Sequence, residues 1–377
     1  MKKAVLLVAA LLVCSSFAFA EVNIGAWGRG FFVVTGADED IQAITMATWG
    51  PGNVRVGASF SGTSDNVGFQ ADVKFDGANV EINDVAKIWV KMFDMLTIQV
   101  GRIWDDTLRG NGAYGMWNWV RVQAGLAPRV MMDGEDLVFA RIGFDPTSML
   151  TNMDGKTVNF EVSLAPVEGL YIFAALGRDG TLPAGSLLLE DCFKNGQYGA
   201  GYTIADIGMI RAQYIGAGDD GLMQVAFKLT AVPGLTVDLG GTIPTDADVF
   251  GFDTKIGLYA SYALDALTIH TADSIAMYDG DFAFGIGVGV DYNIGDGLAL
   301  NADVRYLNDN RSGYEDGMFA GMIGITMGFS NGLIGIAFEG TTGYFADWNG
   351  AGSTTVVNKA EADAFAWAIP IRLEYWF

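Results

Sequence analysis

The sequence predicts an all-β fold, a transmembrane antiparallel up-and-down β-barrel of about 18 strands, with a range of 16–20. Three observations predict it. Apolar and polar residues alternate with period two in segments of about ten residues along most of the chain. The composition is 51% hydrophobic, yet it includes 51 glycines and only eight prolines. The final segment, Ala364 to Phe377, alternates strictly and ends on an aromatic residue.

The N-terminus has the features of a cleaved secretory signal over residues 1–20. Two lysines precede an apolar run at 4–13, and a small-residue cleavage site ends at Ala20. The apolar run is too short for a helix that spans a bilayer. We therefore expect residues 21–377 to form a single transmembrane β-barrel domain.

The two cysteines, Cys14 and Cys192, leave a second interpretation of this terminus open. Cys14 could carry a lipid, although the residue before it, Val13, is larger than lipidation sites prefer. Cleavage after Ala20 would leave Cys192 as the single cysteine, so the remaining chain could form no internal disulfide.

The alternating segments are the expected strands. Clear examples are 67–75, 158–164, 223–231, 255–264 and 298–306. One stretch, Met318 to Phe338, is free of charge and could instead be read as a membrane helix. Its Ser330-Asn331-Gly332 sequence is a hairpin signal, and the residues before it keep period two. We expect two strands there.

The connections between segments are of two kinds, and the two kinds alternate. Short ones occur at 93–94, 166–168, 205–206, 233–234, 265–266, 295–296 and 331–332. Longer acidic ones occur at 35–53, 105–114, 179–196, 244–253, 307–317 and 341–363. This pattern is typical of a barrel with short periplasmic turns and longer extracellular loops.

The last strand carries a resemblance to a known class. Counting back from Phe377, every second residue to Phe365 is apolar or aromatic. A terminal phenylalanine on such a strand resembles the assembly signal of bacterial outer-membrane β-barrels of the general porin type. The resemblance implies that Leu373, Tyr375 and Phe377 are read by the barrel-assembly machinery, and that this strand closes the barrel against the first.

A second, shorter resemblance concerns the segment after Val100. Val100-Gly101-Arg102 leads into a short acidic stretch, and this passage resembles the strand-to-constriction-loop passage of general diffusion porins. The resemblance implies that Arg102, Asp105, Asp106 and Arg109 belong to a loop that narrows the pore.

The residues that alternate with the apolar positions are candidates for the pore lining, because a barrel of this size holds water. They comprise nine basic and five acidic residues: Lys74, Lys87, Lys91, Arg141, Arg211, Lys228, Lys255, Arg305, Arg372, Asp72, Glu161, Asp238, Asp303 and Glu374. The net charge is −22, so the excess negative charge is expected in the loops. An acidic mouth favours cations weakly, whereas the basic wall argues for anions. Alternatively, the acidic loops only keep the surface solvated or bind divalent cations loosely.

Motifs for enzymatic chemistry are weak, and we expect neither an enzyme nor a cofactor or metal site. The formal GxGxxG pattern at 216–221 contains Asp219-Asp220, which would repel a pyrophosphate. The single histidine, His270, excludes a multi-histidine metal centre. An outer-membrane hydrolase using His270 is the enzymatic rival, with Asp273 as the nearby carboxylate. A hydrogen-bonded histidine on the lumen wall is favoured.

The sequence thus predicts an outer-membrane porin that admits small hydrophilic solutes and ions by passive diffusion. Its expected partners are outer-membrane lipid, the barrel-assembly machinery and the solutes, with a homotrimer as an open option and no nucleic acid. Two alternatives remain: a surface barrel that acts as an adhesin or receptor through its loops, and a substrate-specific channel for sugars or fatty acids.

Overall fold

The computed structural model describes residues 21–37, 40–46, 55–76, 79–102, 159–176, 189–309, 314–342 and 365–377. The expected signal peptide, 1–20, and residue Arg141 lie outside these ranges. The strands are β1 (Glu21–Ala37), β2 (Asp40–Met46), β3 (Arg55–Ser64), β4 (Val67–Asp76), β5 (Asn79–Met92), β6 (Leu96–Arg102), β7 (Asn159–Leu164), β8 (Leu170–Leu176), β9 (Gln197–Ile204), β10 (Gly208–Ala217), β11 (Asp220–Leu229), β12 (Leu235–Pro244), β13 (Thr254–Leu264), β14 (Leu267–Tyr278), β15 (Asp281–Gly295), β16 (Leu298–Asp309), β17 (Tyr314–Phe329), β18 (Gly332–Thr342) and β19 (Phe365–Trp376). The short helices are α5 (Leu189–Lys194) and α6 (Ala247–Phe250).

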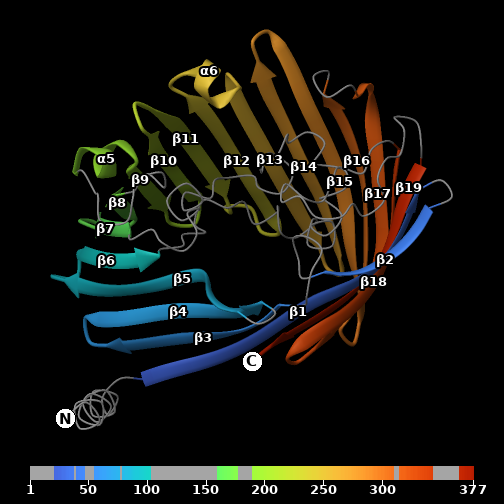
Figure 1. The fold of residues 1–377 in the computed structure, drawn as a ribbon, viewed down its shortest axis with the longest axis horizontal. Coiled ribbons are helices and arrows are strands. Elements are labelled where there is room, and N and C mark those ends of the chain that lie inside the picture. Colours follow the sequence, from blue (N-terminus) through green and yellow to red (C-terminus); the bar gives the residue numbers. More distant parts are fainter. Residues whose placement is uncertain are drawn as a thin grey trace.

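The strands form one closed antiparallel ring. From β3 to β19, each strand pairs with the next along the chain, including β6 with β7 across residues 103–158. The ring closes where β19 pairs with β1, over a register running from Trp27↔Trp376 to Ala37↔Ala366. Figure 1 shows this seam, with the blue β1 and the red β19 side by side.

The nineteen described strands occupy eighteen positions in the ring, as the sequence predicts. On the side away from β19, residues Glu21–Arg29 of β1 pair with β3, and residues Phe31–Ala37 pair with β2. The two shorter strands therefore follow each other along one edge of β1 and together fill a single position. The predicted all-β class and strand number are confirmed.

The two ends of the barrel differ. One end, which we call the terminal rim, carries Glu21, Phe377 and a set of short connections. These connections follow β3, β5, β7, β9, β11, β13, β15 and β17. We call the loop rim the opposite end, which carries α5 and α6 (Figure 1). By the strand bounds, the connections after β1, β4, β10 and β14 at the loop rim are also short, the last two being Gly218-Asp219 and Asp279-Gly280, so the alternation of short and long connections is incomplete.

Aspartate shapes several tight turns of the terminal rim. Asp65, Asp206, Asp265 and Asp296 have φ values of 45°, 61°, 49° and 52°. Tight two-residue hairpins require the left-handed region, and aspartate tolerates it because its short carboxylate can bond the local backbone. The acidic residues here therefore follow from turn geometry, independently of any ligand.

The uncharged stretch Met318 to Phe338 forms a hairpin. Strands β17 and β18 pair from Ala320↔Thr341 to Phe329↔Gly332, with the turn at Ser330-Asn331. The helical alternative for this stretch is therefore excluded. Neither helix in the described part of the chain has the length and apolar character needed to cross a membrane.

Candidate functional site: the inner wall of the barrel

The two faces of the sheet differ sharply in chemistry. On β10, Ile210 is 46% exposed while its neighbour Arg211 is 3% exposed. The same alternation holds on β12, where Leu239 is exposed and Asp238 is buried. Large apolar side chains thus point out of the ring, and the intervening polar ones point into it. This arrangement is the reverse of a soluble protein and suits a wall between lipid and water.

The predicted pore-lining residues lie on the inner register. Thirteen of the fourteen belong to described strands, and Arg141 does not. Six of them are buried: Glu161, Arg211, Asp238, Lys255, Asp303 and Arg372. Lys74, Lys87 and Lys91, by contrast, are at least partly open. Arg305 lies in β16, opposite Gly287 of β15 and Ala320 of β17. The candidates are therefore spread around the ring and form no single cluster.

Several of these charges are paired across or along strands. The Lys228 Nζ lies 3.8 Å from Asp238 Oδ1 on the neighbouring strand. The Arg372 Nη2 lies 2.6 Å from Glu374 Oε1, two residues further along β19. Lys255 places its ammonium 3.5 Å from the centre of the Phe252 ring. Paired and ring-stacked cations hold defined positions, so the inner wall has a fixed charge pattern.

A ladder of amide side chains crosses four adjacent strands nearer the loop rim. Gln197 donates to Gln213 (3.2 Å), which donates to Gln224 (2.6 Å), which donates to the Thr242 hydroxyl (3.3 Å). All four side chains are buried. We call this group the glutamine ladder. Neutral hydrogen-bonded side chains of this kind stiffen the wall without adding charge.

His270 is the centre of a second network, nearer the terminal rim. Its Nδ1 lies 2.6 Å from the Tyr259 hydroxyl, and its Nε2 lies 2.7 Å from Asp291 Oδ2. Asn301 donates to the other oxygen of Asp291 at 2.5 Å. We call these four residues the histidine network. Both ring nitrogens are bonded, as expected for a hydrogen-bonded wall histidine.

The prediction that Asp273 is the carboxylate beside His270 is wrong. Asp273 pairs in register with Leu258 and Ile286, which lie on the outward face, and it accepts a hydrogen bond from Thr271. A strand turns successive side chains to opposite faces, so a residue three positions from His270 cannot share its face. The true carboxylate, Asp291, comes from the next strand.

A cluster of aromatic and charged side chains covers the inner wall from β6 to β10. Glu161 accepts hydrogen bonds from Gln99 (2.6 Å) and from the Tyr171 hydroxyl (3.1 Å). The rings of Tyr171 and Phe173 stack with centroids 5.6 Å apart. The Arg211 guanidinium lies 4.5 Å above the Phe173 ring and 5.7 Å above that of Tyr171. The cluster combines an aromatic surface with both signs of charge.

Glycine makes room for this packing on the neighbouring strand. A Cβ atom at Gly199 would lie 2.6 Å from the Phe173 ring and 2.8 Å from the Ala212 carbonyl oxygen. Gly57 has the same role for the indole of Trp27, which lies on the inner face and donates to Asp72 at 2.9 Å. Part of the high glycine content therefore accommodates rings that lie over the next strand.

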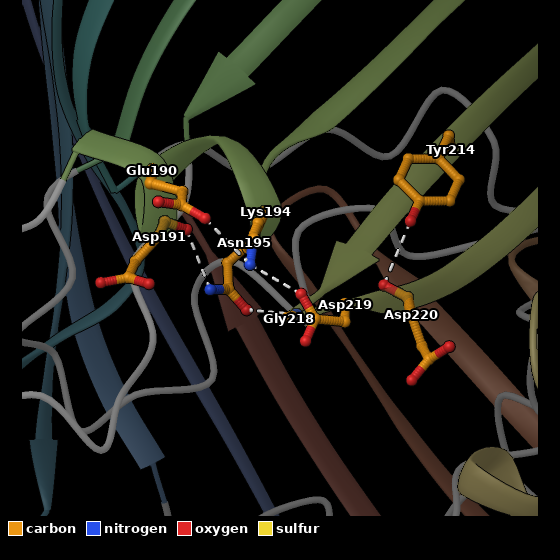
Figure 2. Close-up of polar contacts among 8 residues, drawn as sticks. All are labelled: Glu190, Asp191, Lys194, Asn195, Tyr214, Gly218, Asp219 and Asp220. Carbon is orange, nitrogen blue, oxygen red and sulfur yellow. Dashed lines mark hydrogen bonds and ion pairs between the residues drawn. The ribbon is translucent and has the colours of Figure 1, made fainter.

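At the loop rim, α5 is attached to the turn between β10 and β11 (Figure 2). Lys194 Nζ lies 2.6 Å from Asp219 Oδ1 and 3.1 Å from Glu190 Oε1. The Asn195 side chain accepts from the Gly218 amide and donates to the Asp191 carbonyl. Hydrogen bonding to Asp219 and Glu190 raises the pKa of Lys194, and Lys194 in turn lowers the pKa of Asp219. The side chains of Lys194 and Asp219 are 39% and 85% exposed, so this pair positions the loop more than it stabilises the fold.

The constriction-loop candidates are only partly placed. Arg102 is the last residue of β6 and pairs in register with Ala86. Asp105, Asp106 and Arg109 lie outside the described residues. Among the described ranges, no group of three or more His, Cys, Asp or Glu side chains is placed to hold a metal ion.

The sequence reasoning missed the two networks that the pairing creates. Asp291, Gln197, Gln213 and Gln224 are not among the residues predicted to line the pore. Two short turns at the loop rim could have predicted these contacts. The turns at Gly218-Asp219 and Asp279-Gly280 fix the register of their hairpins, which sets Gln213 opposite Gln224 and brings His270 close to Asp291.

The last strand closes the barrel against the first, as the resemblance implied. Leu373 pairs with Gly30 and Tyr375 with Gly28 of β1. Leu373, Tyr375 and Phe377 are 56%, 50% and 77% exposed, so they form part of the outward apolar face. Phe377 also exchanges backbone hydrogen bonds with Ala26, at 2.8 and 3.2 Å.

Comparison with known proteins gives similarity at the level of the fold. No family model matches the chain, and no curated protein does. Among solved structures, one mutant of the Rhodopseudomonas blastica porin is 17% identical, with a TM-score of 0.47 over 94% of this chain and 100% of that one. Another mutant of the same porin is 16% identical, with a TM-score of 0.46 over 95% and 100%. A loop-deletion mutant of OmpT, an outer membrane protein of Vibrio cholerae, is 15% identical, with a TM-score of 0.43 over 95% and 100%. On the evidence of its own strand pairing, the fold of this chain is the closed antiparallel up-and-down barrel that the sequence predicts.

Proposed function

We propose that this protein is an outer-membrane porin, which lets small hydrophilic solutes and ions diffuse passively through a water-filled barrel. One observation carries the proposal. The sheet closes on itself at eighteen positions, with buried polar and charged side chains inside and exposed apolar ones outside. Barrels of this strand number are too wide for side chains to fill and leave an aqueous channel.

The outer membrane is the environment that such a barrel fits. Closure pairs the edge strands β1 and β19, so no row of backbone groups is left unbonded at the seam, as a bilayer requires. We place the terminal rim in the periplasm and the loop rim outside, since short turns face inward in such barrels. Outer-membrane lipid, the barrel-assembly machinery and the solutes would be its partners, and a homotrimer is the assembly we would test first.

We further propose a weak preference for cations. The described connections of the loop rim carry Glu190, Asp191, Asp219, Asp246, Asp248, Asp253 and Asp279, against the single basic residue Lys194. An acidic entrance raises the local concentration of cations. The lysines of β4 and β5 lie six to eight of the eighteen ring positions away from Asp291 and Asp303, so these lysines oppose the cation preference from a different part of the wall.

A channel is favoured over an enzyme by the position of His270. It lies three residues from the start of β14, close to the terminal rim, whereas a surface hydrolase would need it near the loop rim. Its two nitrogens are bonded to Tyr259 and Asp291, and no serine, threonine or cysteine hydroxyl or thiol is among these partners. We therefore give His270 a role in the wall.

Planar-bilayer recording of the purified, refolded protein tests the proposal. We expect stable open steps of conductance that scale with bulk salt, and a reversal potential in a potassium chloride gradient that indicates weak cation preference. A folded barrel that produces no steps would refute the porin and favour the alternative of a surface barrel that binds through its loops. A clear preference for anions would refute only the proposed weak preference for cations.

A second candidate is a channel specific for sugars. The stacked rings of Tyr171 and Phe173 on the inner wall, next to Glu161 and Arg211, combine an apolar surface with hydrogen-bonding groups. Sugars present both an apolar face and hydroxyl groups, so such a wall could slow their passage. Block of the ion current by an added oligosaccharide, lost in Tyr171→Ala, would favour this candidate over a general porin.

A further inference from the structure

We propose that Asp291 and His270 form a pH-dependent selectivity element on the inner wall. In this proposal Asp291 attracts cations while His270 is neutral, and the carboxylate is neutralised by an ion pair when His270 takes up a proton. The inference rests on the proposed function, because it requires that ions pass along this wall.

Asp291 is held as a fixed carboxylate that still reaches the lumen. Its Oδ2 lies 2.7 Å from His270 Nε2, and its Oδ1 accepts from Asn301 at 2.5 Å. The side chain nevertheless remains 34% exposed. A carboxylate held by two neighbours needs no rearrangement to meet a passing ion, and rings of such groups set the ion preference of pores.

The contacts of His270 define its protonation states. A carboxylate oxygen only accepts hydrogen bonds, so the neutral ring carries its proton on Nε2 and accepts from the Tyr259 hydroxyl at Nδ1. When a second proton binds Nδ1, that nitrogen donates to the Tyr259 oxygen, and the hydroxyl proton turns away. A hydroxyl can play both parts, so both contacts persist. The charge of the site changes while the wall keeps its shape.

His270 is the single histidine of the whole chain. Histidine is the side chain whose ordinary pKa lies between pH 5 and 8, so a selectivity change in that interval points to this residue. The groups that face it can be named. Tyr259 faces it from β13 and Asp291 from β15, while Asp238 on β12 acts on Tyr259. On its own strand, Asp273 lies on the opposite face.

Neighbouring strands make this stretch of wall acidic. Asp303 lies two residues from Asn301 on β16, on the same face of the sheet, and it is buried. Asp291 and Asp303 are thus two carboxyl groups on the same face of this part of the sheet. Protonation of His270 compensates one of them, and the one compensated is the more exposed carboxylate, Asp291.

The test is the reversal potential of the purified full-length barrel in a potassium chloride gradient, at about pH 8 and about pH 5. The variants are His270→Gln, Asp291→Asn and, as a matched control, Asp72→Asn, which changes an inner-wall carboxylate on β4. The inner wall already accommodates glutamine in the glutamine ladder, and His270→Asn serves as a second variant if His270→Gln does not fold.

We expect the cation-to-anion permeability ratio of the wild type to fall about twofold or more between the higher and the lower pH. The ratio should become independent of pH in His270→Gln, low and independent of pH in Asp291→Asn, and should keep its pH dependence in Asp72→Asn. A conducting wild type without this shift, or a His270→Gln barrel that retains it, would overturn the inference and leave the porin intact. A folded wild type that conducts no current would instead overturn the proposed function, and the inference with it.

Discussion

Replacing Gln213 by leucine tests whether the glutamine ladder is sealed from the lumen water. Gln213 is central in the ladder, because it accepts from Gln197 and donates to Gln224, at 3.2 and 2.6 Å. Leucine is similar in size but can do neither. The substitution would leave the Gln197 amide without an acceptor and the Gln224 carbonyl without a donor.

The expected cost follows from the burial of the two groups left behind. Gln197 is 3% exposed and Gln224 is 8% exposed, so water cannot readily replace the lost partner. A buried polar group without a partner costs about 1–3 kcal/mol. Two such groups cost roughly 2–6 kcal/mol, and burial of the apolar leucine returns about 1–2 kcal/mol of this. We therefore expect a net loss in unfolding free energy of roughly 1–4 kcal/mol.

Urea unfolding in phospholipid vesicles, followed by tryptophan fluorescence, measures this loss. The matched control is Gln70→Leu, because Gln70 is on the inner register of β4 but is exposed, and a change there should stay within about 0.5 kcal/mol. The double variant Gln213→Leu with Gln224→Leu should lose less than the two single losses added together, since it removes both partners of one bond. Equal stability of Gln213→Leu and Gln70→Leu would contradict this expectation and show that water reaches the ladder.

Three further outcomes are expected. Asp273→Leu should stabilise the barrel in lipid vesicles by about 1–3 kcal/mol, because a buried carboxyl oxygen on the outward face lacks a partner; destabilisation would mean that something other than lipid covers this face. A spin label on Cys192 should become more mobile at neutral pH in Asp219→Asn, because the ion pair that attaches α5 is lost. In the wild type the same increase in label mobility should appear below about pH 4. The lowered pKa of Asp219 means that the ion pair stabilises the attachment of α5 above the pKa of an unfolded aspartate, and that this contribution is lost as Asp219 is protonated. Lys194, whose pKa is raised, stays charged throughout this pH range. Gly57→Val should destabilise the barrel by about 1–3 kcal/mol in urea unfolding, because its side chain would occupy the space of an indole ring; an unchanged midpoint would contradict this packing.

Much of the fold follows from the sequence because alternation is a local property. Once Val225 and Phe227 are assigned to the outward face, Gln224 and Lys228 must face inward, whatever lies on the neighbouring strands. The short turns predicted after β5, β9, β13, β15 and β17 are found within a residue of the expected places, because left-handed turn geometry is set by the turn residues themselves, whereas the connection predicted at 233–234 spans 230–234. Constriction of the pore stays a prediction, since Asp105, Asp106 and Arg109 lie outside the described residues.

The networks on the wall could not be predicted in the same way. His270 meets Asp291 because of the register between β14 and β15, and Asp273, although closer in sequence, lies on the other face. The Arg211 stack on Phe173 likewise joins β10 to β8 across β9. Each contact depends on where a neighbouring strand starts, and a shift of one residue would invert which side chains meet.

The all-β class, the two chemical faces and the last strand before Phe377 follow from the amino-acid sequence, because each is encoded in the spacing of residues along one strand. The tertiary structure narrowed the predicted range of strand number to eighteen ring positions, and it set the register of the seam and the partners of the inner side chains. The ring has eighteen positions because β1 pairs with both β2 and β3 on one edge and with β19 on the other. Closure is a property of all strands together, so no single segment of sequence contains it.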